Sequence, residues 1–387
     1  MNTALPIRGK NRLEWIDAAR GFAVFGIFIV NIGSFSAPYF LYGGGDRVWN
    51  EPVDSFIRII IDIFFQASFY TLFSLLFGFG YQIMSERLRA KNISLYPFLI
   101  RRMSILFGFG LIHAFVIWYG DILLTYSVVG FILLLFINVR SKYLLWVAVI
   151  LLGSSVSFIT FVYYIARDYL GVSNQAAINE AFANYQSRNF FLIWEQNYTD
   201  WMYANGGIGI IFLVMTILPL FLIGMYIARK RLLHEPENYR AILWKIWSVS
   251  FVIFILLKMG PYLFDNPPWF SYIQDNVGGG ASAIFYIVSM TLLAQSNRGK
   301  RMTRAFTYVG RMALTSYITQ SIFLFLLSYG IGLYGSISPL VGIIIVILFY
   351  SLQVLFSKWW FMRYQFGPLE WVWRSLTYWK RQPFKRS

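Results

Sequence analysis

Long, unbroken apolar stretches recur along the whole chain, and they constrain its fold more than any other feature. About ten such stretches occur in 387 residues, and only 13% of the sequence is charged. A helix needs roughly 20 apolar residues to cross the hydrocarbon core of a bilayer. Only helices and closed barrels satisfy their backbone groups there. Because the stretches are continuous rather than alternating, they predict membrane-spanning helices.

We therefore predict an all-α fold, a polytopic integral membrane helical bundle of about ten transmembrane helices, with residues 1–387 as a single membrane domain. The predicted spans are residues 16–35, 63–84, 98–118, 122–139, 144–166, 208–228, 243–264, 279–294, 305–329 and 339–361.

The density of lysine and arginine alternates between successive connections, and this pattern predicts the orientation. Basic residues gather before the first span, in every second connection and in the tail; they are Arg8, Lys10, Arg12, Arg87, Arg89, Lys91, Arg101, Arg102, Arg140, Lys142, Arg229, Lys230, Arg231, Arg240, Arg298, Lys300, Arg301, Arg304, Lys380, Arg381, Lys385 and Arg386. The exceptions in the other connections are Arg47, Arg58, Arg167 and Arg188. We expect both termini to be cytoplasmic, with an amphipathic tail at 363–387. The formal charge of +16 then indicates anionic inner-leaflet lipids as partners, and no nucleic acid.

The composition also excludes several classes of site. The chain has no cysteine and two histidines, so disulfides and thiol chemistry are excluded. No Cys/His cluster suggests a metal site, and no glycine-rich phosphate loop follows a strand. Asp17 and Arg20 beside the first apolar run favour a retained anchor over a cleaved signal peptide.

The longest hydrophilic piece, residues 168–206, is predicted to be an extracytoplasmic loop. It contains four acidic residues and several aromatic ones, including Trp194 and Trp201. We expect short helices that lie over the outer mouth of the bundle. The alternative is an inert loop, because aromatic residues are also common anchors at the membrane interface.

Polar residues inside the spans are informative because burying them in lipid is costly. At helical spacing, Asp17, Arg20 and Asn31 share one face of the first span with small residues. That face is predicted to point into the bundle. Asp17 and Arg20 are three residues apart and can pair. Either they form a structural ion pair, or this face belongs to a functional interior.

His113 and Asp121 form the smallest general-base unit that the sequence offers. His113 lies near the end of the third span, and Asp121 opens the fourth after a short turn. A carboxylate near a histidine can orient the ring for proton transfer. The alternative is structural: His113 bonds a helix carbonyl, and Asp121 caps the next helix.

Other polar residues fit the same interior. Asp62 and Gln66 share a face of the second span and are candidates for substrate binding. Four arginines are expected to converge at the inner side; they are Arg20, Arg102, Arg311 and Arg374. They could bind an anionic group such as the phosphates of coenzyme A. Alternatively they bind lipid headgroups or form structural ion pairs with Asp17 and Glu370.

Several blocks of the sequence resemble the YeiB family of bacterial membrane proteins, also known as domain of unknown function 418. The blocks are residues 12–31, 69–80, 101–126, 310–320 and 366–378. They contain most of the polar residues that burial cost had singled out. The resemblance implies a helical protein of the bacterial inner membrane.

The opening block is also similar to that of membrane acyltransferases, which move an acyl group from cytoplasmic acyl-coenzyme A to an acceptor across the membrane. The similarity covers Asp17, Arg20 with Gly21, and Asn31. Those enzymes carry a functional histidine in the outer segment after the first span, whereas residues 36–69 contain none. His113 would have to serve instead.

The sequence thus leads to an acyltransferase hypothesis with an alternative. In the first, the arginines bind acyl-coenzyme A as donor, with no covalently bound cofactor and no metal. His113, oriented by Asp121, deprotonates a small-molecule or glycan acceptor, and Asn31 holds the developing oxyanion. The alternative is a transporter or exporter of a small solute or lipid-like molecule, and a scaffold role is a third possibility.

Overall fold

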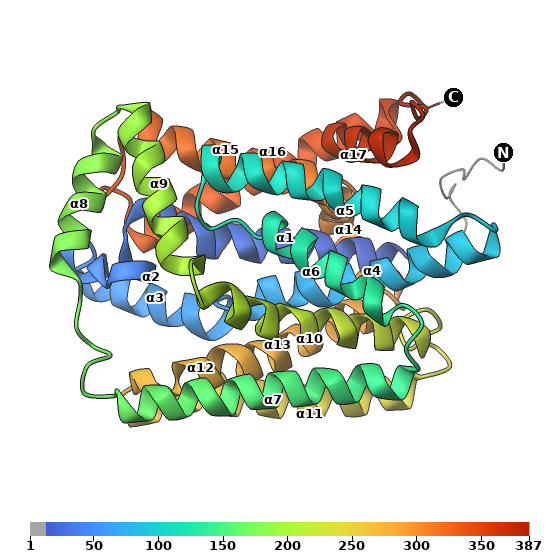
Figure 1. Cartoon of the computed structure of the whole chain (residues 1–387), viewed down its shortest axis with the longest axis horizontal. Helices are drawn as coiled ribbons and strands as arrows, with labels where there is room; N and C mark the ends of the chain where they lie inside the picture. Colours follow the sequence, from blue (N-terminus) through green and yellow to red (C-terminus); the bar gives the residue numbers. More distant parts are fainter. Residues whose placement is uncertain (1–12, 387) are drawn as a thin grey trace.

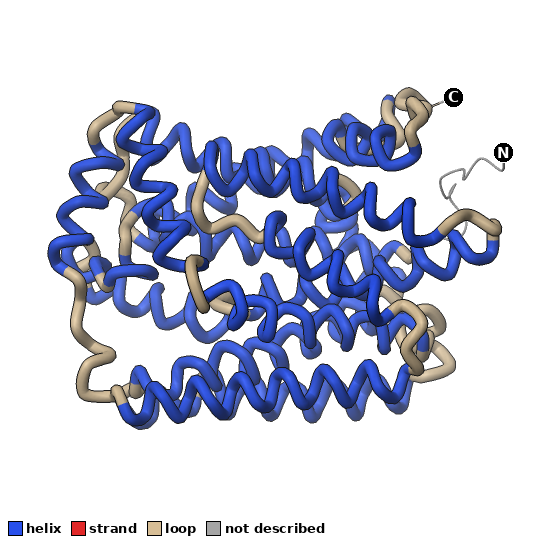
Figure 2. Tube along the Cα trace, in the orientation of Figure 1, coloured by secondary structure: helices blue, strands red, loops and turns tan. Residues whose placement is uncertain are grey.

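The computed structural model describes residues 13–386, and this part of the chain is helical almost throughout, without a named strand (Figures 1 and 2). Arg8, Lys10 and Arg12, used above for orientation, lie outside the described residues. The α-helices are α1 (Glu14–Ser36), α2 (Tyr39–Tyr42), α3 (Pro52–Phe64), α4 (Ser68–Ala90), α5 (Leu95–Ile112), α6 (Leu123–Ile132), α7 (Ser141–Ile165), α8 (Gln175–Gln186), α9 (Phe190–Asn205), α10 (Gly209–Arg229), α11 (Arg240–Lys258), α12 (Ser271–Ile273), α13 (Gly279–Leu293), α14 (Asn297–Gly310), α15 (Ala313–Phe325), α16 (Pro339–Arg363) and α17 (Pro368–Tyr378). Shorter 3₁₀ or π-helical turns are η2 (Gly44–Arg47), η3 (His113–Ile117), η4 (Leu133–Phe136), η5 (Gly260–Phe264), η6 (Pro268–Phe270), η7 (Gln274–Gly278) and η8 (Leu326–Gly330).

The all-α prediction is confirmed, but the number of spans is smaller than the ten expected. Eight helical segments of the described chain are long and apolar enough to cross a membrane. A ninth is possible if α14 and α15, which are bent by 73° at a short break, count as one span. The predicted span 122–139 corresponds to α6 and η4, whose apolar helix Leu123–Phe136 is shorter than a full crossing requires. The chain is an integral, multi-pass membrane protein.

Helix α1 lies in the centre of the bundle, where it contacts α4, α13, α14, α15 and α16. Glycine allows its closest approach. A β-carbon on Gly21 would overlap the carbonyl oxygen of Phe306 in α14. A second close crossing joins α4 and α10, where Gly78 and Gly224 meet the partner backbones in the same way. Small residues let membrane helices pack tightly, because lipid provides no hydrophobic force between them.

The outer helices carry the apolar surface that a bilayer requires. Helices α7 and α11 lie along one edge of the bundle in the view of Figure 1, where α7 packs against α10 and α11 packs against α13. Large apolar side chains such as Trp146, Ile150, Leu348 and Leu355 are exposed on α7 and α16. Exposed apolar surface of this extent is typical of a lipid-facing belt rather than of a water-soluble protein.

The two ends of the bundle differ. Helices α8 and α9 lie at one end, and α17 lies at the other, near the start of α1 (Figure 1). The segment 168–206, expected to contain short helices, does form two. They are fastened to α2 by Asp200, which accepts hydrogen bonds from Tyr42 at 2.8 Å and Tyr185 at 2.7 Å. At the opposite end, Trp373 of α17 donates a hydrogen bond to the Arg102 carbonyl of α5.

Candidate functional site

The structure brings His113 and Asp121 together. His113 opens the π-helical turn η3 where α5 ends, and Asp121 lies in the loop before α6. The ring Nδ1 lies 2.8 Å from Asp121 Oδ1, and both side chains are buried. The atoms are in contact, although their directions do not meet the geometry of a hydrogen bond. Asp121 Oδ2 also accepts a hydrogen bond from the backbone N–H of Leu124 at 2.5 Å. Asp121 therefore caps the start of α6 and contacts the histidine.

The environment of His113 is closed and partly unsatisfied. Its side chain has no exposed surface, and Tyr317 covers the ring at a centroid distance of 5.0 Å. Within residues 13–386, His113 Nε2 has no hydrogen-bond partner. A buried polar atom without a hydrogen-bond partner lowers the stability of the fold, so a polar group that pairs with Nε2 would be bound favourably. Asn31 lies half-buried on α1, and no hydrogen bond joins it to His113 in the described chain.

Three of the four predicted arginines, Arg20, Arg102 and Arg374, lie near one another at the α17 end. Together with Arg311, the fourth predicted arginine, we call them the basic cluster. Arg102 is close enough to Arg20 and Arg374 for their charges to interact. Arg20 is paired with Asp17 at 3.0 Å. The Arg102 guanidinium lies 3.6 Å from the ring centre of Trp373. The arrangement combines positive charge with aromatic faces.

Arg311, the fourth member of the basic cluster, follows α14 and stacks on Phe361 at 3.9 Å, and Arg374 stacks on Phe366 at 4.6 Å. Stacking of this kind supports and orients a guanidinium group. Planar guanidinium edges match the oxygen spacing of phosphate groups.

Glu370 of α17 reaches the bend between α14 and α15. Its Oε1 accepts hydrogen bonds from the backbone N–H groups of Leu314 at 2.7 Å and Thr315 at 3.2 Å. Its Oε2 accepts one from the Thr315 hydroxyl at 2.6 Å. Burial raises the pKa of the Glu370 carboxyl, while these hydrogen bonds oppose the rise. The carboxylate therefore caps the N-terminus of α15, where orphan N–H groups need acceptors.

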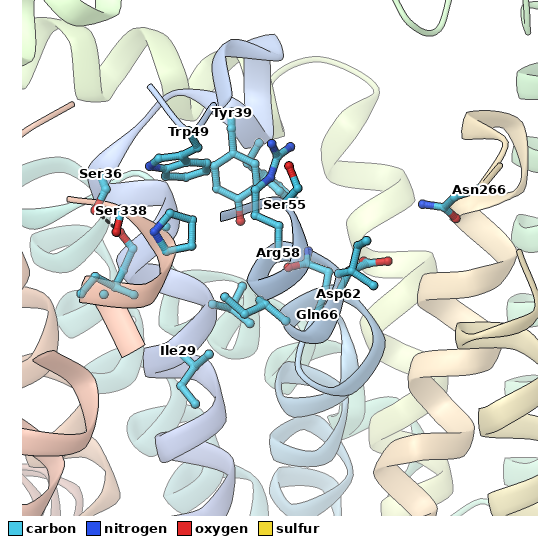
Figure 3. Close-up of a pocket in the computed structure, with 18 of the residues that line it drawn as sticks. Ile29, Ser36, Tyr39, Trp49, Ser55, Arg58, Asp62, Gln66, Asn266 and Ser338 are labelled. Carbon is cyan, nitrogen blue, oxygen red and sulfur yellow. Dashed lines mark hydrogen bonds between the residues drawn. The ribbon is translucent and has the colours of Figure 1, made fainter. Parts of the chain in front are cut away.

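A pocket lies at the end of the bundle opposite to α17, on the same side as α8 and α9. It has a volume of about 600 Å³ and is bordered by the end of α1, by α3, by η5, α12 and η7, and by the start of α16 (Figure 3). Asp62 and Gln66, the predicted substrate-binding residues, both line it. His113, Asp121 and the basic cluster are not among the described residues that line it.

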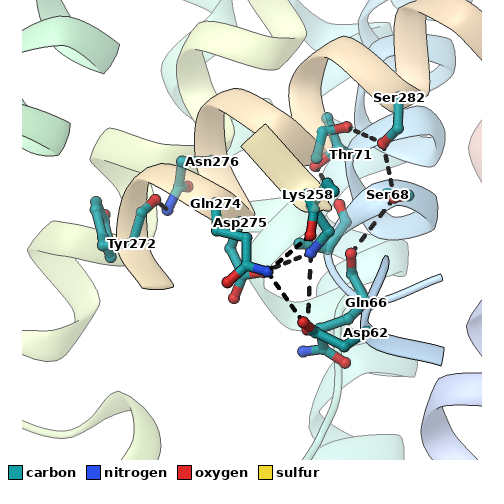
Figure 4. A network of polar contacts seen from close by, with 12 residues as sticks. Asp62, Gln66, Ser68, Thr71, Lys258, Tyr272, Gln274, Asp275, Asn276 and Ser282 are labelled. Carbon is teal, nitrogen blue, oxygen red and sulfur yellow. Dashed lines mark hydrogen bonds and ion pairs between the residues drawn. The ribbon is translucent and has the colours of Figure 1, made fainter. Parts of the chain in front are cut away.

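Three charged residues, which we call the charged triad, meet at this pocket: Asp62 and Asp275 line it, and the buried Lys258 contacts both (Figure 4). We call this part of the lining the floor of the pocket. Lys258 of α11 is fully buried, with Nζ 3.1 Å from Asp275 Oδ1 and 3.7 Å from Asp62 Oδ1. Asp62 Oδ2 accepts hydrogen bonds from Tyr262 at 2.6 Å and from Gln274 at 3.1 Å. Gln274 also donates to the Lys258 carbonyl at 3.2 Å. Three charges from α3, α11 and η7 thus share one polar network.

Irregular backbone surrounds the charged triad. Helix α3 ends at Phe64 and α4 begins at Ser68; between them Ala67 adopts a left-handed conformation with φ of 60°. Ser282 of α13 holds the break by a hydrogen bond to the Ser68 hydroxyl at 2.7 Å. On the other side, η7 is π-helical. Such irregularities are rare in helices and are frequent at functional sites.

Comparison with known proteins places the chain in a family. The profile of a family described as "Protein of unknown function (DUF418)" matches residues 227–380. The "Uncharacterized protein YxaH" of Bacillus subtilis (strain 168) is 34% identical over 100% of this chain and 99% of its own length. The chain belongs to the DUF418 family. The "Uncharacterized protein YeiB" of Escherichia coli (strain K12) is 28% identical over 94% of this chain and 95% of its own. No solved structure matches the chain.

This DUF418 protein contains two polar residues that the sequence reasoning did not select. Lys258 stands inside the predicted span 243–264, where a charge is costly in lipid and therefore indicates a functional or paired position. Asp275 lies in the turn before the next predicted span, and an acidic residue in a turn does not by itself indicate a functional site. Only the fold shows that Lys258 and Asp275 meet Asp62.

Proposed function

We propose that this DUF418 protein is a membrane acyltransferase that moves an acyl group from cytoplasmic acyl-coenzyme A to an acceptor on the other side. The observation that carries the proposal is the 2.8 Å contact between His113 Nδ1 and Asp121 Oδ1, with His113 Nε2 unpartnered in the described chain. A histidine that contacts a carboxylate at one ring nitrogen can use the other for proton transfer.

The donor would bind at the basic cluster. Coenzyme A carries several phosphate groups, and arginines recognise phosphate through paired hydrogen bonds. Arg20, Arg102 and Arg374 lie near one another, and their guanidinium groups are supported by Asp17, Trp373 and Phe366. Mutual repulsion between these cations gives an anionic ligand a further advantage at this site.

The reaction then follows from the roles assigned to each side chain. His113 Nε2 takes the proton of an acceptor hydroxyl or amine as that oxygen or nitrogen attacks the thioester carbonyl. Asn31 is assigned to the developing oxyanion. When the tetrahedral intermediate collapses, the C–S bond breaks, and His113 returns the proton to the thiolate, so that coenzyme A leaves as a thiol. Because His113 is enclosed, access to Nε2 requires η3 or Tyr317 to move.

The proposal includes an orientation. The α17 end, with the basic cluster, faces the cytoplasm and anionic inner-leaflet lipids. The pocket, α8 and α9 face the outside, where a small-molecule or glycan acceptor would enter. The alternating basic connections support this orientation, and bacterial relatives support the cell membrane as its location.

A transfer assay tests the proposal. Purified protein in liposomes receives acetyl-coenzyme A with a panel of sugars and amines, and released thiol and acetylated product are measured. We expect His113→Ala to lower the rate by ~10²–10⁴-fold and Asp121→Asn to lower it less. Acetyl-coenzyme A binding should be unchanged in both variants. Full activity of His113→Gln would show that the ring only has a structural role.

Transport of a small solute is a second candidate, and the charged triad favours it. Helix breaks that place polar groups around a membrane-embedded site are typical of secondary transporters. The break at Ala67 and the π-helical η7 both border the triad. Uptake into liposomes without any acyl donor, abolished by Asp275→Asn and unaffected by His113→Gln, would support transport over acyl transfer.

A further inference from the structure

The charges on the floor of the pocket do not balance. Asp62 and Asp275 bring two negative charges, and Lys258 brings one positive charge. All three belong to segments that qualify as membrane spans. A structural ion pair in such a place needs only one carboxylate, because every further charge adds a desolvation cost. The second carboxylate therefore requires a further explanation.

The three charged side chains also differ in their exposed fraction. The Lys258 side chain has no exposed surface, whereas those of Asp62 and Asp275 are 28% and 33% exposed. Asp62 and Asp275 line the pocket, whereas Lys258 is not among its lining residues and contacts both carboxylates from the buried side (Figure 4). A molecule that enters the pocket meets negative charge first.

Among residues 13–386, Arg58 is the other charged side chain that lines the pocket, and it does not cancel this excess. Its Nη1 is paired with Asp46 Oδ1 at 2.9 Å. Its guanidinium lies 5.6 Å from the ring centre of Trp49, away from the floor (Figure 3). With this exposed pair included, three carboxylates face two cations, so an excess of one negative charge remains.

We propose that the pocket binds a small organic molecule through a protonated amino group, which lies against Asp62 and Asp275. Two cations then face two carboxylates, with Lys258 behind and the ligand in front. The aromatic ring of Tyr262, which lines the pocket and contacts Asp62, favours a cation further. This assignment does not depend on the acyl-transfer proposal, because an amine fits the site either as acceptor or as transported solute.

The remainder of the pocket limits the body of the ligand. A volume of about 600 Å³ lies within the range of small-molecule sites, roughly 300–1,000 Å³. Gln66, Asn266 and Ser271 in the lining offer hydrogen bonds. Ile29 and Pro339 add apolar surface to the lining. The pocket thus suits an amine with a compact, partly polar body.

Binding to the purified full-length protein tests the assignment directly. Three amines are each compared with a counterpart that has a hydroxyl in place of each amino group: glucosamine with glucose, ethanolamine with ethylene glycol, and cadaverine with 1,5-pentanediol. The readout is the dissociation constant from calorimetry at pH 7. We expect at least one amine to bind at least tenfold more tightly than its counterpart.

Variants locate the site. Asp275→Asn leaves one carboxylate for Lys258 and should remove the preference for the amine, whereas Ser55→Ala, an uncharged change in the lining, should retain it. If Asp275→Asn does not fold, Asp62→Asn is tested in its place. The comparison of amine and alcohol on the wild type tests the proposal without any variant. Equal affinity for amine and alcohol, binding of none of the three amines, or an unchanged preference in a folded Asp→Asn variant would overturn the assignment. Displacement of the amines by equimolar Na⁺ would also overturn it. Acyl transfer is not measured, so failure here is distinct from failure of the proposed function.

Discussion

Gly310 of α14 lies directly against the backbone of α1, so that a β-carbon at position 310 would overlap the carbonyl oxygen of Asp17. Gly21 makes the reciprocal contact with Phe306. The two glycines set the distance between the central helix and α14. They also place Arg20 and Arg311, their neighbours in sequence, at the same end of the bundle.

We expect Gly310→Ala to destabilise the protein, because the new methyl group pushes two backbones apart. Overpacking of a tight contact typically costs ~1–3 kcal/mol, measurable by thermal unfolding in detergent. Gly153→Ala is the matched control, since a β-carbon on Gly153 of α7 meets no atom within 4 Å. A neutral Gly310→Ala variant would mean that α1 and α14 can separate freely.

Arg102→Ala should weaken the binding of coenzyme A, because a charge-assisted hydrogen bond is worth ~1.5–3 kcal/mol. Isothermal titration with coenzyme A in detergent and in nanodiscs measures the effect. Arg240→Ala serves as control, since Arg240 is exposed at the start of α11. If the wild type binds no coenzyme A in either medium, the donor site is wrong.

Reporter fusions test the orientation. Fusions after Arg87 and after Ser387 should report the cytoplasm, and a fusion between α8 and α9 should report the outside, because the positive connections remain inside. A tail that reports the outside would change the span count from even to odd and would contradict the assignment of the basic cluster.

Asp200 should make the stability of the α8–α9 end depend on pH. Burial raises the pKa of the Asp200 carboxyl, despite hydrogen bonds from Tyr185, Tyr42 and Gln196 that lower it. Because the pKa is raised in the folded state, the protonated form of the Asp200 carboxyl favours folding. Its contribution to the free energy of unfolding is complete below the ordinary pKa of 3.8 and is lost as pH rises through the raised pKa. We expect thermal unfolding temperatures to fall over that interval more in the wild type than in Asp200→Asn. Parallel pH profiles would contradict this.

The sequence was sufficient for the helices but only partly for the site. Apolar length predicted the long helices α1, α4, α5, α7, α10, α11, α13 and α16. It missed α3 as a separate helix, so Asp62 lies on α3 and Gln66 lies in the break before α4, not on one shared helix face. It also overcounted the spans, because α6 with η4 is short and α14–α15 is sharply bent. Asp121 could be associated with His113 because only a short turn separates their helices. Lys258 and Asp275 are different: they meet Asp62 from elements about 200 residues away. No local pattern encodes such a contact.

The hydrogen bonds that Glu370 accepts have a consequence for the order of biosynthesis. The residues of α15 leave the ribosome before those of α17, yet Leu314 and Thr315 have their backbone N–H groups satisfied by this later carboxylate. In a nascent chain that does not yet include Glu370, the N–H groups of Leu314 and Thr315 lack this acceptor. Unsatisfied backbone groups are costly in a membrane protein. The bend between α14 and α15 can therefore take its final form only after translation has passed residue 370, so this part of the bundle depends on a later helix and is not completed span by span.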